Sequence, residues 1–182
     1  MKVSSIVPYS SSVSQDALLP RYRLVLGLFI IGLILSGLTA FPLLHELRLM
    51  ASLLGIENHA SYAQHEGLAF WLGYVWHGLE VTQQQFPFVA YGTDWLAFGH
   101  LMIAVFFIAG PWRDPVPNAW VLKVGLFACA AVFPLALICG EVRGIPLSWR
   151  LVDCSFGLFG ALPLLYCLRL GRQMSAGTSS RS

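Results

Sequence analysis

The chain has 182 residues, of which 57% are hydrophobic and 11% are charged, and its formal net charge is +2. A soluble domain carries about 25% charged residues. The deficit of charge and the mean hydropathy of +0.68 exclude an ordinary soluble domain and indicate a protein that lies in lipid. The net charge is small and no basic stripe is visible, so we expect no nucleic-acid partner.

The N-terminal segment, residues 1–21, is polar and rich in serine, and it lacks the apolar core of a secretory signal. We therefore expect the first apolar helix to remain in the protein as an anchor. A helix needs ~20 apolar residues to cross ~30 Å of hydrocarbon. The segments of this length are predicted at about 22–44, 93–112, 119–140 and 148–170.

A further helical pattern lies between the first two spans, at about 66–84. Its polar residues recur at helical spacing and form one stripe, whereas the remaining surface is apolar and aromatic. The stripe consists of Glu66, Gly73, His77, Glu80 and Gln84. We expect this helix to lie in the outer interface or to re-enter the bundle, without crossing the membrane.

The distribution of basic residues predicts the orientation of the chain. With four spans, most of them share one side: Lys2, Arg21, Arg23, Arg113, Lys123, Arg169, Arg172 and Arg181. The positive-inside rule makes that side cytoplasmic. We therefore expect a multi-pass protein of the cell inner membrane, with the N-terminal segment and the tail at 171–182 in the cytoplasm. A fifth span at 66–84 would separate the two basic ends.

The expected fold is that of an all-α integral membrane protein. We predict a single domain at 22–170, a four-helix transmembrane bundle with an additional outer interfacial or re-entrant amphipathic helix. Each span carries a stripe of small residues, such as Gly32, Ser36 and Thr39 in the first span and Gly157 and Gly160 in the last. These stripes should form the helix contacts. Cys139 and Cys154 flank one short outer loop, so the sequence leaves a disulfide between them open.

His100 and Asp153 are ionisable residues on stripes that should face the interior of the bundle. Such residues within a membrane are functional candidates by default. His100 is either a ligand of a cofactor or metal, or a packing histidine bonded to a backbone carbonyl or to Asp153. Asp153 is either a metal ligand, a proton carrier or a group that orients His100, or it pairs with Arg150 and fixes the helix end.

His77 and Glu80 lie three residues apart on one face of the outer helix. Helical bundles bind metals through a Glu-x-x-His spacing. The order is reversed here and occurs once, so a water-facing polar stripe is the alternative. Should this helix fold over the bundle, we predict a metal site of iron, copper or zinc. Its ligands would be His100, His77, Glu80 and Asp153.

Haem b is the other cofactor that the histidines suggest, since it needs two axial ligands in an apolar slot. His100 would supply one ligand, and His45 or His77 the other, because no other span contains a histidine. The residues expected around the site are Asp94, Glu141 and Arg150. Helix capping or contact with water at the outer helix ends would explain these polar residues equally well.

Several functions remain open from these residues. The leading expectation is a metal- or haem-binding redox protein with an outward-facing His/carboxylate pocket; whether it is an enzyme is undecided. The alternative is a non-catalytic accessory or assembly subunit, in contact with other membrane subunits as well as the lipid bilayer. A proton-coupled carrier is disfavoured, because the inner halves of the spans contain almost no polar residues.

Overall fold

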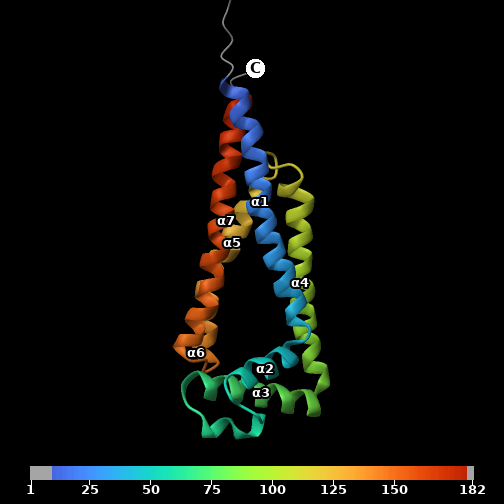
Figure 1. The fold of residues 1–182 in the computed structure, drawn as a ribbon, viewed down its shortest axis with the longest axis vertical. Coiled ribbons are helices and arrows are strands. Elements are labelled where there is room, and N and C mark those ends of the chain that lie inside the picture. The colour runs from blue at the N-terminus through green and yellow to red at the C-terminus, as the bar shows by residue number, and fades with distance from the viewer. Residues whose placement is uncertain (1–9, 180–182) are drawn as a thin grey trace, which may run out of the picture. The chain divides into compact units, whose positions relative to one another are not determined.

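The computed structural model describes residues 10–179, and this part of the chain is helical without strands (Figure 1). The helices are α1 (Ser10–Ala40), α2 (Leu43–Leu53), α3 (Gly67–Gln85), α4 (Tyr91–Phe107), α5 (Ala119–Pro134), α6 (Gly140–Val142) and α7 (Leu147–Ser179). Two short 3-10 segments are η1 (His59–Gln64) and η2 (Pro87–Ala90). Two π-helical turns, η3 (Ile108–Trp112) and η4 (Leu135–Cys139), continue α4 and α5.

In the described part of the chain, four helical stretches are long and apolar enough to cross a membrane. They are Ala17–Ala40, Pro87–Trp112, Ala119–Val142 and Leu147–Ala176. Helix α3 is not among them, as expected. Many large apolar side chains on these stretches are exposed, which suits contact with lipid.

The helix ends differ from the predicted ones. Helix α1 ends at Ala40 and α2 begins at Leu43, whereas the first span was expected to continue to residue 44. Pro42 causes this break, because a proline disfavours helical backbone at the residue before it. Helices α1 and α7 also extend into the polar ends of the chain, because hydropathy marks only the apolar part of a helix.

The described chain forms two compact units, one of residues 10–31 and 105–179 and the other of residues 32–104. In the first unit, α5 and α7 pack closely where small residues meet. A Cβ added at Gly157 would lie 2.5 Å from the carbonyl oxygen of Cys129, and one added at Gly160 would lie 3.1 Å from the Cys129 sulfur. The small-residue stripes of the third and fourth spans therefore form this contact, as predicted.

The other helices of the first unit join the same packing. An added Cβ at Gly125 would lie 2.9 Å from both Phe107 and Leu164, which come from α4 and α7. Phe107 also stacks edge-on against Phe29 of α1, with ring centroids 5.0 Å apart. Parts of α1, α4, α5 and α7 thus pack together, consistent with the expected helical bundle.

The second unit contains the end of α1, the start of α4 and the α2–α3 segment between them. Helices α2 and α3 lie side by side (Figure 1), and their buried side chains include Leu47, Leu72 and Trp76. At Gly37 the end of α1 approaches α4 closely, since an added Cβ would lie 3.0 Å from the carbonyl oxygen of Ala97. This unit holds most of the polar residues that the sequence singled out.

Candidate functional site

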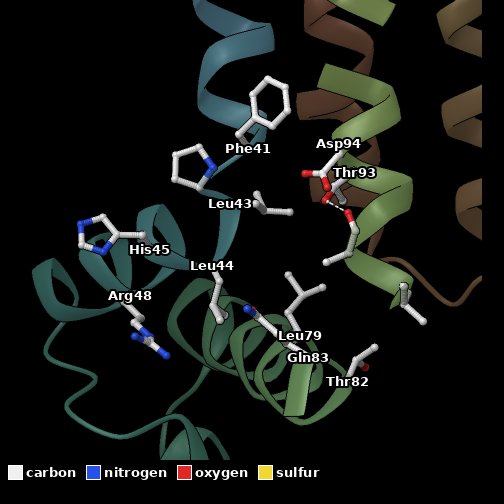
Figure 2. A pocket seen from close by; sticks show the side chains of 13 residues that line it. Phe41, Leu43, Leu44, His45, Arg48, Leu79, Thr82, Gln83, Thr93 and Asp94 are labelled. Carbon is white, nitrogen blue, oxygen red and sulfur yellow. Dashed lines mark hydrogen bonds between the residues drawn. The ribbon is translucent and has the colours of Figure 1, made fainter. Parts of the chain in front are cut away.

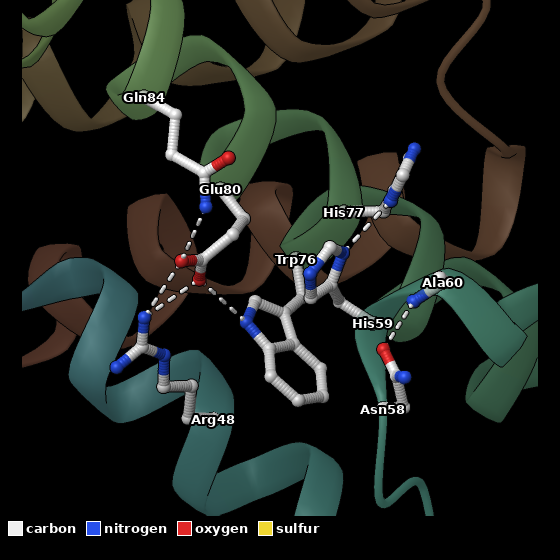
Figure 3. A network of polar contacts seen from close by, with 8 residues as sticks. All are labelled: Arg48, Asn58, His59, Ala60, Trp76, His77, Glu80 and Gln84. Atoms are coloured by element: carbon white, nitrogen blue, oxygen red, sulfur yellow. Dashed lines mark hydrogen bonds and ion pairs between the residues drawn. The ribbon is translucent and has the colours of Figure 1, made fainter.

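An ion pair joins α2 to α3 in the second unit (Figure 3). Arg48 Nη2 lies 2.8 Å and 2.7 Å from the two carboxylate oxygens of Glu80. Trp76 Nε1 donates to the same carboxylate at 3.3 Å, and Gln84 Nε2 donates at 3.4 Å. The hydrogen bond from Arg48 holds the pKa of Glu80 below its usual value, and burial opposes this effect. Glu80 is therefore an ionised structural partner of Arg48.

Next to this ion pair, two histidines face each other (Figure 3). The Nδ1 atoms of His59 and His77 are 2.9 Å apart, so one nitrogen donates and the other accepts. Their rings stack at a centroid distance of 5.1 Å, and the His59 ring meets Trp76 edge-on. This pair fastens η1 to α3, where Gly73 leaves room for Tyr62: an added Cβ at Gly73 would lie 2.8 Å from the Tyr62 Cβ.

A hollow of about 360 Å³ lies between the end of α1, α2, α3 and the start of α4 (Figure 2). Its walls are mainly apolar, formed by side chains such as Phe41, Leu44 and Leu79. Figure 2 shows the Asp94 carboxylate turned toward the side on which Phe41 and Leu43 lie. The polar groups of the lining are His45, Arg48, Thr82, Gln83, Thr93 and Asp94.

Among these polar groups, Asp94 has no hydrogen bond or ion pair with any residue in the range 10–179 and is half-buried. Thr93 is satisfied locally, because its hydroxyl donates to the Ala90 carbonyl at 2.6 Å. His45 and Asp94, predicted as a possible haem ligand and as a surrounding group, thus line one hollow. The carboxylate remains available to a bound molecule.

His100 lies at the contact between α1 and α4. Its Nδ1 is 2.9 Å from the Leu96 carbonyl one turn earlier, and its Cβ would be 3.2 Å from a Cβ added at Gly37. The expected carbonyl bond of a packing histidine is therefore present. With the proton on Nδ1, this bond leaves the Nε2 lone pair free.

The remaining predicted residues lie in the first unit. Asp153 lines a hollow of about 250 Å³ together with Cys139 and Arg143. Arg150 pairs with Glu141 at 2.5 Å, and not with Asp153 three residues away. Gly140 leaves room for the ion pair with Glu141, since the aliphatic part of the Arg150 side chain lies against that glycine. Cys139 and Cys154 are both free thiols.

The predicted metal ligands do not gather into one group in the described residues. No cluster of three or more His, Cys, Asp or Glu side chains suited to a metal ion occurs within residues 10–179. Glu80 is held by Arg48, and His77 by His59. The set of His100, His77, Glu80 and Asp153 therefore stays a prediction without support from these contacts, and so does the haem pair.

Sequence reasoning did not single out three residues that the structure places at these sites. His59 and Arg48 find their partners across 18 and 32 residues of chain, and no local periodicity encodes such pairings. The sequence did mark the position of Phe41, because the following Pro42 indicates that the helix ends there.

Comparison with protein-family models, with curated proteins and with solved structures finds no match for this chain. The function must therefore be argued from the residues themselves.

Proposed function

We propose that this chain is a multi-pass membrane protein that binds a small amphipathic molecule in the hollow between α2, α3 and α4. The observation that carries the proposal is an apolar cavity of about 360 Å³ that also holds His45, Arg48 and Asp94. Small-molecule sites usually measure about 300–1,000 Å³ and combine apolar walls with a few polar groups. In this proposal, the histidine and the carboxylate of the expected pocket are His45 and Asp94.

The position of the hollow supports a ligand taken from the membrane surface. Phe41 and Pro42 directly follow the candidate span Ala17–Ala40, and Asp94 lies near the start of the span Pro87–Trp112. The hollow therefore lies near the ends of two candidate spans, a depth that in a membrane would correspond to the boundary between lipid headgroups and acyl chains. A ligand with both apolar and polar parts suits that depth.

We also propose that the protein resides in the cell inner membrane with both termini in the cytoplasm. The excess of lysine and arginine at the two ends of the chain and in the link around Arg113 supports this orientation. The α2–α3 segment and its hollow would then face away from the cytoplasm.

Direct analysis of the bound molecule tests the proposal. Leu79 lines the hollow, whereas Leu68 lies on the same helix and is 58% exposed. Mass spectrometry of protein purified in mild detergent should find an amphipathic molecule on the wild type and on Leu68→Trp. Leu79→Trp, or Thr82→Phe as a second variant, should have lost most of it. A wild type without any such molecule, or equal retention in all folded variants, would overturn the proposal.

His100 supports a second candidate, the redox protein that binds haem b or a transition metal. Histidines that ligate metals usually donate their other ring N–H to a carbonyl or carboxylate. The bond of 2.9 Å between His100 and the Leu96 carbonyl would orient the ring in this way. An absorption spectrum without a Soret band, together with elemental analysis that finds no stoichiometric metal, would remove this candidate.

A further inference from the structure

A second hollow, of about 310 Å³, adjoins the proposed ligand cavity and shares Phe41 and Asp94 with it. Its other lining residues are Tyr91, Trp95 and Phe98 of α4. These three follow one another at spacings of four and three residues, which places them on one face of the helix. Phe41 adds a fourth aromatic side chain from the turn that follows α1.

The aromatic rings of α4 stand at nearly right angles to one another. Tyr91 and Trp95 have centroids 5.9 Å apart and an interplanar angle of 83°. Trp95 and Phe98 are also 5.9 Å apart, with an angle of 86°. Neighbouring rings are thus perpendicular to each other, so the aromatic faces at this hollow point in different directions.

Asp94 is the charged residue of this lining, and its carboxylate lies on the side of the first hollow, which shares it. Its carboxylate makes no ion pair with any residue in the described range, and Arg48, which lines the first hollow, is paired with Glu80. An acid in the first turn of α4 also gains from the helix dipole. That gain explains an acid at this position but not the aromatic side chains around it.

We infer that this second hollow binds an ammonium group, carried as the headgroup of the amphipathic molecule. The inference rests on the proposed function, since the apolar part of that molecule would occupy the first hollow. Aromatic faces attract an ammonium that lies within about 6 Å of their centroids, and cages of such faces recognise quaternary ammonium groups. Asp94, at the boundary of the two hollows, supplies the opposite charge. An interfacial aromatic belt accounts for exposed rings but requires no carboxylate among them.

Quenching of Trp95 fluorescence tests this inference. Two nitroxide amphiphiles of equal chain length, one with a quaternary ammonium head and one with an uncharged head, are titrated into the protein in uncharged maltoside micelles. The signal of Trp95 is the difference between each protein and the same protein with Trp95→Phe. We expect the ammonium amphiphile to quench at an about tenfold lower mole fraction. Asp94→Asn should remove this preference, whereas Glu66→Gln, which neutralises an exposed acid of the same unit, should keep it.

The outcomes separate this inference from the proposed function. Saturable quenching by both amphiphiles at equal mole fractions would leave the proposed function standing and overturn the ammonium site. A preference that persists in Asp94→Asn would also overturn it. If neither amphiphile quenches Trp95 saturably, the ammonium site is excluded, while the proposed function is decided by whether the purified protein retains an amphipathic molecule. Equal mole fractions for the two heads on the wild type overturn the ammonium site even if Asp94→Asn does not fold.

Discussion

At the scale of single residues, Glu80 shows how a spacing that suits metal binding can serve the fold. The spacing of three residues places His77 and Glu80 one turn apart on α3. Each side chain nevertheless bonds to a residue of another segment and not to a shared metal ligand set. Arg48 reaches Glu80 from α2, and His59 reaches His77 from η1. The two pairs hold α2 and η1 against α3, so these polar residues fasten the segment that lies between the spans.

The Arg48–Glu80 pair gives the stability of this segment a pH dependence. A carboxyl whose pKa is lowered by folding stabilises the folded state above the pKa of the unfolded chain, about 4.3. The contribution is lost as the pH falls through the lowered folded-state value. We expect Glu80→Gln to lower the free energy of unfolding by less than about 1 kcal/mol at pH 7, because Arg48 is half exposed. The difference from wild type should begin to shrink as the pH falls below about 4.3 and should vanish once the pH lies below the lowered pKa of Glu80.

Thermal unfolding in detergent, followed by tryptophan fluorescence across this pH range, measures the effect. Glu57→Gln serves as the control, because Glu57 is an exposed acid of the same unit. It should match the wild type at every pH. A deficit of Glu80→Gln that stays constant down to the lowest pH would contradict the electrostatic account.

At the scale of helices, the contact between α5 and α7 depends on Gly157. Its added Cβ would lie 2.5 Å from the Cys129 carbonyl oxygen, and backbone cannot rotate out of the way as a side chain can. Gly157→Ala should therefore force the helices apart and destabilise the protein by about 1–3 kcal/mol. Gly171→Ala on the same helix has no atom within 4 Å of the new Cβ. It should be neutral or stabilising by up to about 1 kcal/mol, because alanine is the better helix former.

Unfolding with increasing dodecyl sulfate in mixed micelles compares the two glycine variants. The midpoint should fall for Gly157→Ala and hold or rise for Gly171→Ala. Equal midpoints would mean that the helices accommodate the methyl group, and that the close approach at Cys129 does not limit stability.

The helices could be predicted from the sequence because their signals are local. Hydropathy gave the four candidate spans, and the stripe that includes His77 and Glu80 gave α3 nearly to the residue. Small residues gave the contact at Gly157. The glycine that brings the end of α1 against α4 is Gly37, whereas the predicted stripe of α1 contained Gly32, which has no neighbour within 4 Å. Which small residue meets a partner depends on the direction of the neighbouring helix, and a single segment does not encode that direction.

The candidate site was less accessible to sequence reasoning for the same reason. Asp94 and His45 were visible as polar residues near span ends, but the hollow that they line needs the turn at Pro42. That turn directs α2 away from α1 and opens space next to α4. A cavity is a property of several elements together, whereas periodicity describes one element at a time.

At the scale of the whole molecule, the number of spans determines where the hollow faces. Alkaline phosphatase, active only outside the cytoplasm, can be fused after successive truncation points along the chain. With four spans and a cytoplasmic N-terminus, fusions after Ile56, Gln85 and Gly144 should be active, and those after Asp114 and Ser182 should be inactive. Green fluorescent protein at the same points should give the opposite pattern, since it fluoresces in the cytoplasm.

The fusion after Gln85 is the most informative of the series, because it follows α3. If α3 crossed the membrane, this fusion would become inactive and the one after Asp114 active, since every later segment would change sides. An inverted pattern throughout would instead keep four spans and reverse the orientation. Only the expected pattern places the hollow at Asp94 and the aromatic side chains of α4 at the outer surface, where an ammonium headgroup of the outer leaflet could reach them. The fusion series therefore also tests whether the proposed ammonium site can face the outer leaflet.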